Sequence, residues 1–216
     1  IHEKKRFLEN FYKEPDVHIV FKNKEKLNGF DEGIIKTSST SGFLLDKKEI
    51  KNKESFIRGD WWVQDFSSFF SLNNIKFKNQ DLKLLDACSA PGGKAFQLLS
   101  KNLEVTLNDK SKRRIQTLKS NLNRLKFNPK VLNKDFIKFD KNEKFDFIII
   151  DAPCSAVGTI RKNPEIFFKS KMPDFDRLNN LQQNMLDKAA LLLNVGGNIL
   201  YMTCSFIKNE TFDQIN

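Results

Sequence analysis

The stretch L-K-L-L-D-A-C-S-A-P-G-G-K, at residues 82–94, decides how this 216-residue chain folds. Its first half is a short apolar run, and its second half is a glycine turn that opens an amphipathic segment at residues 94–101. A buried strand followed by a turn and a helix is the repeating unit of a parallel sheet covered by helices. The stretch therefore predicts an α/β domain with a ligand site where the strand ends.

The same alternation continues along the chain. Five apolar or β-rich runs are expected strands, at residues 82–87, 104–109, 129–133, 145–151 and 198–203. Three amphipathic runs are expected helices, at residues 94–101, 111–126 and 174–193, and Gly196 with Gly197 is expected to end the last one. The series predicts an α/β fold with a Rossmann-like, doubly wound sheet. Because the chain stops soon after the fifth strand, we expect the C-terminal strands of this fold to be truncated.

The first 60 residues have a different pattern. They mix charges of both signs, contain a polar T-S-S-T-S-G segment at residues 37–42 that predicts a loop, and include an alternating run at residues 17–21 that predicts a strand. We therefore expect two parts: a small α+β lobe over residues 1–60 and the main domain over residues 61–216.

Composition limits the class of protein. Lysine and arginine number 37 against 27 acidic residues, which gives a net charge of +10. This excess favours a polyanionic partner, either nucleic acid or an anionic membrane surface, although lysines that merely solvate helix faces would give the same charge. Three widely spaced cysteines indicate a reducing, cytoplasmic setting rather than a disulfide framework. No Cys or His spacing suits a metal site, and no apolar run approaches the roughly 18 residues that span a membrane.

Carboxylates follow the strands on either side of the glycine turn. Asp109 lies about 20 residues after the turn, where a carboxylate can accept hydrogen bonds from ribose hydroxyls, although it could instead cap the helix that begins near Ser111. Asp135 follows the third strand, where it could meet an adenine amino group or be an ordinary loop residue. The turn itself could be only a tight connection, but these neighbours favour a nucleoside-binding cleft.

Two cysteines follow the last two strands. The motif D-A-P-C-S-A-V-G-T-I-R-K-N-P-E spans residues 151–165, and T-C-S spans residues 203–205. Because parallel strands end at one edge of a sheet, Asp151, Cys154 and Cys204 are expected to face the same cleft as the glycine turn. Burial as small apolar residues is the commonest alternative for free cysteines.

Taken together, these motifs resemble those of the RsmB and NSUN type RNA cytosine-5 methyltransferases. The resemblance covers about residues 61–213, in the family's order, and includes W-V-Q-D-F-S-S at residues 62–68. The N-terminal residues resemble part of the family's RNA-binding lobe, whereas the NusB-like helical extension of RsmB-type members is not visible. The chain departs from the family pattern at Lys110-Ser111, where relatives often have a second acid, and at Ser89, where alanine is common.

The resemblance implies a chemistry and a set of roles. Carbon 5 of cytosine is a poor nucleophile until a thiolate adds to carbon 6. The resemblance implies that Cys204 is this nucleophile, that Cys154 assists release of the adduct, and that Asp151 holds the base. The implied cofactor is S-adenosylmethionine, held by Cys88, Ser89, Ala90, Pro91, Gly92, Gly93, Lys94, Asp109, Asp135 and Asp151.

The implied substrate is RNA, either ribosomal or transfer RNA, with no metal and no membrane partner. The target base must be unstacked so that carbon 6 is accessible. Lys94 would steady the site or lower a cysteine pKa, or else face solvent, while Arg161 and Lys162 are expected beside the cleft. Methylation of another acceptor, or a catalytically silent RNA-binding scaffold, would not need two cysteines in the cleft. A nicotinamide-dependent oxidoreductase would need a G-x-G-x-x-G turn that is absent here.

Overall fold

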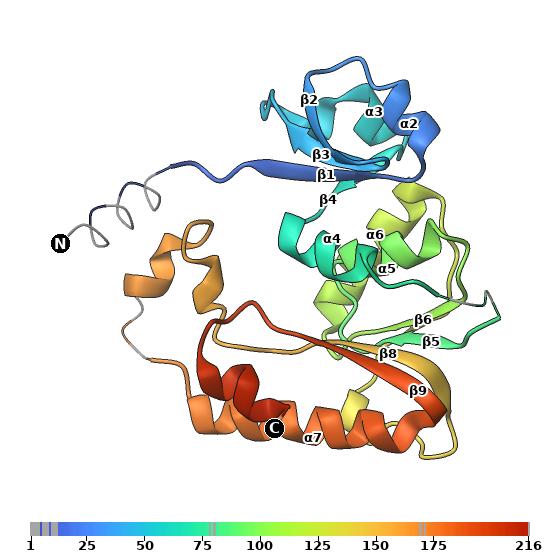
Figure 1. Ribbon diagram of the computed structural model, residues 1–216, viewed down its shortest axis with the longest axis vertical. Helices are drawn as coiled ribbons and strands as arrows, with labels where there is room; N and C mark the ends of the chain where they lie inside the picture. The colour runs from blue at the N-terminus through green and yellow to red at the C-terminus, as the bar shows by residue number, and fades with distance from the viewer. Residues whose placement is uncertain are drawn as a thin grey trace.

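A computed structural model describes most of the chain, and in it the protein has two sheets (Figure 1). The described residues are Lys5, Glu9, 13–77, 79, 81–168, 170 and 172–215. A small antiparallel sheet lies above a larger parallel sheet, and the helix α4 (Phe66–Asn73) lies between them. Within these residues no helix combines the length and the apolar character needed to cross a membrane.

The parallel sheet confirms the predicted Rossmann-like fold. Its strand order is β7 (Val131–Leu132), β6 (Val105–Asn108), β5 (Leu84–Asp86), β8 (Phe145–Asp151) and β9 (Leu193–Met202), with every neighbouring pair parallel. The chain builds outward from β5 in one direction and then, from β8, in the other. The order therefore reverses between β5 and β8, and ligands bind at such a switch point, beyond the carboxyl ends of the strands.

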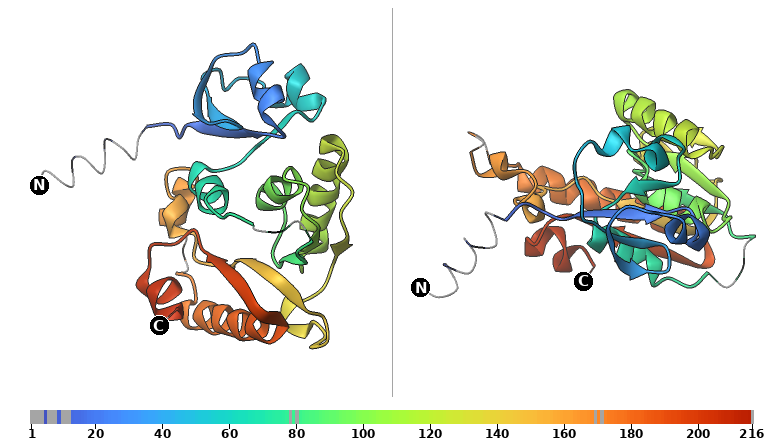
Figure 2. Two further views of the ribbon diagram at one scale, coloured as in Figure 1. Left: turned by 45° about the vertical axis from the view of Figure 1, so that its right-hand side comes forward. Right: turned by 90° about the horizontal axis from the view of Figure 1, so that it is seen from above.

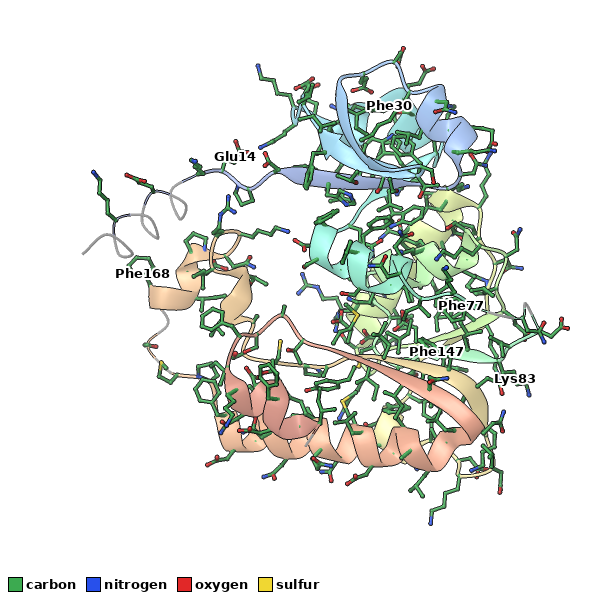
Figure 3. All side chains as sticks on the ribbon, in the orientation of Figure 1. Glu14, Phe30, Phe77, Lys83, Phe147 and Phe168 are labelled. Carbon is green, nitrogen blue, oxygen red and sulfur yellow. The ribbon has the colours of Figure 1, made fainter. Side chains whose placement is uncertain are left out.

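Helices cover both faces of this sheet (Figure 2). On one face lie α5 (Gly93–Leu99) and α6 (Lys112–Leu125), and on the other lies α7 (Phe175–Leu192). Alternate strand residues supply the two cores: Leu84 packs with α5 and α6, and Leu85 packs with α7. Phe77 closes the first core against Phe147 of β8, with ring centroids 5.2 Å apart (Figure 3).

The end of α7 differs from the expectation. We expected Gly196 and Gly197 to end the helix, but α7 ends at Leu192 and β9 already begins at Leu193. Leu193 pairs with Phe145, and the register then shifts before Phe147, so the glycines lie inside an irregular part of the strand. Gly197 is required there because an added Cβ would lie 3.0 Å from two backbone oxygens.

The antiparallel sheet has the order β2 (Ile34–Ser38), β3 (Ser41–Leu44), β1 (Val17–Phe21) and β4 (Trp61–Val63). The helices α2 (Lys24–Asn28) and α3 (Glu54–Ile57) complete an α+β lobe. The prediction of a loop at residues 37–42 was wrong, because β2 and β3 form a hairpin whose turn consists only of Ser39 and Thr40. The sheet also extends to Val63, three residues beyond the boundary expected at residue 60.

Strand β4 connects the two parts of the molecule. Trp61 packs into the core of the small lobe, whereas its neighbour Trp62 packs into the core beneath α5. Arg124, near the end of α6, donates to the backbone oxygens of Phe56 and Trp61, at 2.7 and 3.0 Å.

The remaining short 3-10 helices are η1 (Ile50–Asn52), η2 (Phe136–Lys138), η3 (Val157–Thr159), η4 (Pro164–Phe168), η5 (Lys208–Glu210) and η6 (Phe212–Gln214). Phe168 of η4 is exposed and projects from the molecule (Figure 3).

Candidate active site

An ion pair lies at the switch point of the parallel sheet. Lys94, on the first turn of α5, places its Nζ 2.6 Å from Oδ2 of Asp151, at the end of β8. The Lys94 side chain is only 13% exposed, so the alternative of a solvent-facing lysine was wrong. The pair joins the helix that follows β5 to the end of β8, and the strand order reverses between β5 and β8.

Two cavities meet at this ion pair. The larger has a volume of about 620 Å³ and contains Cys204, and the smaller, of about 190 Å³, contains Cys88 and the glycine turn. Both are lined by Asp65, Ser68, Lys94 and Asp151. A molecule in the smaller cavity would therefore meet one in the larger cavity across the Lys94–Asp151 wall.

The turn beside the smaller cavity depends on its glycines and on a buried amide. Gly92 has φ +121°, and a Cβ there would lie 1.9 Å from the ring of Phe96. Ser89 donates from its hydroxyl to the oxygen of Asn108 at 3.0 Å, which is the physical role of serine where relatives often have alanine. Asn108 donates to Ala87 and Lys134 and accepts from Lys134, so this residue, which the sequence did not single out, joins three loops.

Asp109 and Asp135 lie outside the walls of both cavities, and each has an ionic partner. Oδ1 of Asp109 accepts from the backbone of Ser111 at 2.8 Å, and Oδ2 lies 3.3 Å from Arg114 without a hydrogen bond. Asp135 accepts from Lys110 at 2.7 Å, and this interaction lowers the pKa of Asp135. Ser111, rather than Asp109, caps α6.

Asp86 is a site residue that the sequence analysis did not select. It ends β5, is 1% exposed and lines the smaller cavity, and neither carboxyl oxygen has a hydrogen-bond partner among the described residues. Burial raises the pKa of Asp86 to about 7, with Lys94 lowering it and Asp151 raising it further. An unpaired buried carboxyl group is costly for folding, and a bound cation would compensate it. The signal was available in the sequence, as the acid that closes an apolar strand.

The structure brings Cys154 and Cys204 together, with their Sγ atoms 3.2 Å apart. Cys204 is exposed and Cys154 is partly exposed, so neither is an ordinary core residue. The hydrogen bond from Cys204 lowers the pKa of Cys154 to about 7, and the same interaction raises the pKa of Cys204. Neighbouring thiols lose their protons in two coupled steps, and the hydrogen bond between them favours loss of the first proton. By contrast, burial raises the pKa of Cys88 to about 12.

The remaining walls of the larger cavity combine hydroxyl groups and cations. Helix α4 contributes Ser67, Ser68 and Ser71, and the loop after β8 contributes Arg161 and Lys162, where the sequence placed them. Lys162 forms an ion pair with Asp65 across the opening. In the described part of the chain, no cluster of three or more His, Cys, Asp or Glu side chains could hold a metal ion.

A doubly wound sheet with a glycine turn at its switch point is the fold of Rossmann-like methyltransferases, here with two thiols beside the turn. Residues 73–216 match the family model described as 16S rRNA methyltransferase RsmB/F, and the chain belongs to this family. The family depends on S-adenosylmethionine. The resemblance inferred from the motifs is thus confirmed.

Similar proteins are found among both sequences and solved structures. Ribosomal RNA small subunit methyltransferase B of Shewanella oneidensis is 35% identical over 178 residues, which are 80% of this chain and 41% of that protein. The crystal structure of PH0851 covers 99% of this chain and 52% of that one, at 26% identity and TM-score 0.86. NSun6 from Pyrococcus horikoshii, solved with SFG, covers 76% of this chain and 43% of that one, at 27% identity and TM-score 0.68. The chain spans about two fifths of the curated relatives.

Proposed function

We propose that this chain is the catalytic part of an RNA cytosine-5 methyltransferase, with ribosomal RNA as the first substrate to test and transfer RNA as the second. The observation that carries the proposal is the pair of thiols 3.2 Å apart at the ends of β8 and β9, in the cleft that Lys94 and Asp151 divide. Methylation at carbon 5 of cytosine requires a thiol nucleophile, and a second thiol is suited to the release of the adduct.

The residues present fit S-adenosylmethionine, which supplies an electrophilic methyl group when it is bound. Oδ2 of Asp109 is an acceptor without a hydrogen bond, but it is buried beside Arg114 and outside both cavities, so a ribose would reach it only after Arg114 moves aside. Asp86 presents its carboxyl group to the smaller cavity. The turn at residues 88–94 follows Asp86 and ends at Lys94, and most of its residues line the smaller cavity. In support, NSun6 is solved with SFG, an S-adenosylmethionine analogue. Asp135, paired with Lys110, would have to exchange that partner to reach an adenine.

In the proposed reaction, the Cys204 thiolate adds to carbon 6 of cytosine and makes carbon 5 nucleophilic. Carbon 5 takes the methyl group from the sulfonium of S-adenosylmethionine, which leaves as an uncharged thioether. Carbon 5 then loses its proton to solvent, and the electrons of that C–H bond expel Cys204 from carbon 6 as a thiolate. Cys154 lies within proton-transfer distance of Cys204, so it can take the thiol proton before attack and assist the departure of the sulfur afterwards. Its lowered pKa suits this exchange at neutral pH.

Asp151 is the proposed base-holding residue. Its carboxylate projects from the end of β8 into the larger cavity, where Lys94 fixes it at 2.6 Å. There it can accept a hydrogen bond from the exocyclic amine of the base or, once protonated, donate one to ring nitrogen 3. A group placed in this way stabilises the charge that develops on the ring when the thiolate adds.

The product analysis tests the proposed function directly. RNA from cells that lack the gene should accept a methyl group from S-adenosylmethionine when it is incubated with the intact protein. We expect mass spectrometry of the digested RNA to show 5-methylcytidine, and bisulfite sequencing to place it at an unpaired position. Methylation of a different base, or of another atom of cytosine, would contradict the proposal.

Asp109→Ala is expected to weaken S-adenosylmethionine binding by about 1 to 3 kcal/mol, because ribose hydroxyls would lose a buried acceptor. Isothermal titration calorimetry measures the change. Ser111→Ala is the matched control, since it removes the cap of α6 and should lower stability while leaving the affinity intact. If Asp109→Ala lowers only the stability, the role of Asp109 is to accept the hydrogen bond from the backbone of Ser111, and the ribose site lies elsewhere.

A further inference from the structure

Glu210, near the C-terminal end of the described residues, is fully buried. It is 0% exposed and lies on η5, which packs against α7 (Figure 1). Glutamate is almost never fully buried unless it is paired, and no cation is bonded to this one among the described residues. Its carboxylate must therefore be compensated by hydrogen bonds.

Those hydrogen bonds come mainly from the loop of the first cysteine. Oε1 of Glu210 accepts from the backbone nitrogen of Ser155 at 2.8 Å, and Oε2 accepts from the hydroxyl of Ser155 at 2.5 Å. Gln182 of α7 donates to Oε1 at 3.3 Å and to the oxygen of Pro153 at 2.9 Å. Two contacts thus hold the residue directly after Cys154.

The loop of the second cysteine meets the same carboxylate. The hydroxyl of Ser205, directly after Cys204, lies 3.3 Å from that of Ser155, which itself donates to Glu210. Burial opposes ionisation of Glu210, but the hydrogen bonds from Ser155 and Ser205 outweigh it and lower the pKa of Glu210. The charge is therefore held between the two serines that follow the two cysteines.

We propose that Glu210 is a positioning residue that fixes the Cys154 and Cys204 loops to each other, so that the two thiols stay within hydrogen-bond distance. The inference rests on the proposed function for its catalytic consequence, but the geometry can be tested without RNA. Glu210 also acts on the thiols through its charge, which raises the pKa of Cys154 against the larger, lowering effect of Cys204.

The test compares Glu210→Ala and Glu210→Gln in the intact protein, with Asp213→Asn as the matched control. Asp213 is an exposed acid three residues further along that forms an ion pair with Lys208, at 3.5 Å. The geometric probe is phenylarsine oxide, which loses its oxygen as water when both thiols of a close pair bind its arsenic. The electrostatic probe is the pH dependence of cysteine alkylation, with the modified residue identified by mass spectrometry.

We expect wild type and Asp213→Asn to chelate the arsenical through Cys154 and Cys204. Glu210→Ala should chelate it more weakly, and its methyl transfer rate should fall by about 100-fold with S-adenosylmethionine affinity unchanged, because misplaced reacting groups lose rate rather than cofactor binding. Glu210→Gln keeps an oxygen for Ser155 and should still chelate, but its alkylation profile should shift to lower pH. If Glu210 had a purely structural role, Glu210→Gln would lower the melting temperature and leave the pH dependence of alkylation unchanged.

Wild-type chelation in Glu210→Ala, or an unshifted alkylation profile in Glu210→Gln, overturns the inference. If Glu210→Ala does not fold, Ser155→Ala replaces it in the chelation test, because it removes the hydroxyl that donates to Oε2 of Glu210 and should weaken chelation in the same way. Failure of the proposed function has a different signature, because wild type would then show no methyl transfer to RNA while all the thiol measurements remained as expected.

Discussion

Cys204→Ala is expected to abolish both methyl transfer and any covalent protein–RNA complex, whereas Cys154→Ala is expected to accumulate that complex. If Cys204 attacks carbon 6, nothing replaces it, since the neighbouring Cys154 lies on a different loop. Without Cys154, attack and methylation proceed, but the departing sulfur has lost the group 3.2 Å away that assists it. A denaturing gel of protein incubated with RNA and S-adenosylmethionine shows the adduct as a shifted band.

The opposite pattern would reassign the roles. An adduct that is lost in Cys154→Ala and retained in Cys204→Ala would make Cys154 the nucleophile. Full activity without any adduct in either variant would exclude covalent catalysis. The lowered pKa of Cys154 makes this comparison informative, because the hydrogen bond between the thiols favours ionisation of Cys154 rather than of the proposed nucleophile.

Asp151→Asn is expected to lower the rate of methyl transfer by about 10² to 10⁴, the usual contribution of a positioned acid or base. The amide keeps the size of the side chain but cannot exchange a proton with the base, and it leaves Lys94 without its ionic partner. Single-turnover kinetics with saturating S-adenosylmethionine measure the chemical step.

Asp65→Asn is the control for this variant. Asp65 lines the same cavities and also pairs with a lysine, Lys162, but it belongs to the start of α4 rather than to a strand end. We expect a much smaller loss of rate from it. Equal losses in the two variants would indicate that the charge of the cavity, rather than a contact of Asp151 with the base, determines the rate.

The fold was largely predictable because buried parallel strands have a strong sequence pattern. The run at residues 145–151 coincides with β8, whose two faces pack in two different cores. The end of α7 was not predictable, since Leu191, Leu192 and Leu193 have the same apolar character and the helix stops where Leu193 pairs with Phe145. The hairpin at residues 34–44 was missed because hydroxyl side chains that predict a loop bond to one another across it.

The cleft was predictable in position but not in its contacts. Strand ends meet at one edge, so Asp151, Cys154 and Cys204 could be placed there from the order of the motifs alone. Side-chain partners depend on packing that no local pattern records. The pairing of Asp109 with Arg114 and of Asp135 with Lys110, and the burial of Glu210 against Ser155, appear only in three dimensions.

The adjacent indoles of Trp61 and Trp62 have a consequence for how RNA would be presented. They are 0% and 2% exposed and are anchored in different cores, so the small lobe cannot pivot on β4 without extracting one of them. Strand β4 therefore does not act as a hinge between the two parts of the molecule. Under the proposed function, an RNA strand bound to the small lobe would be held at a constant distance and angle from the thiols, and the RNA itself would have to change conformation to bring the target base to them.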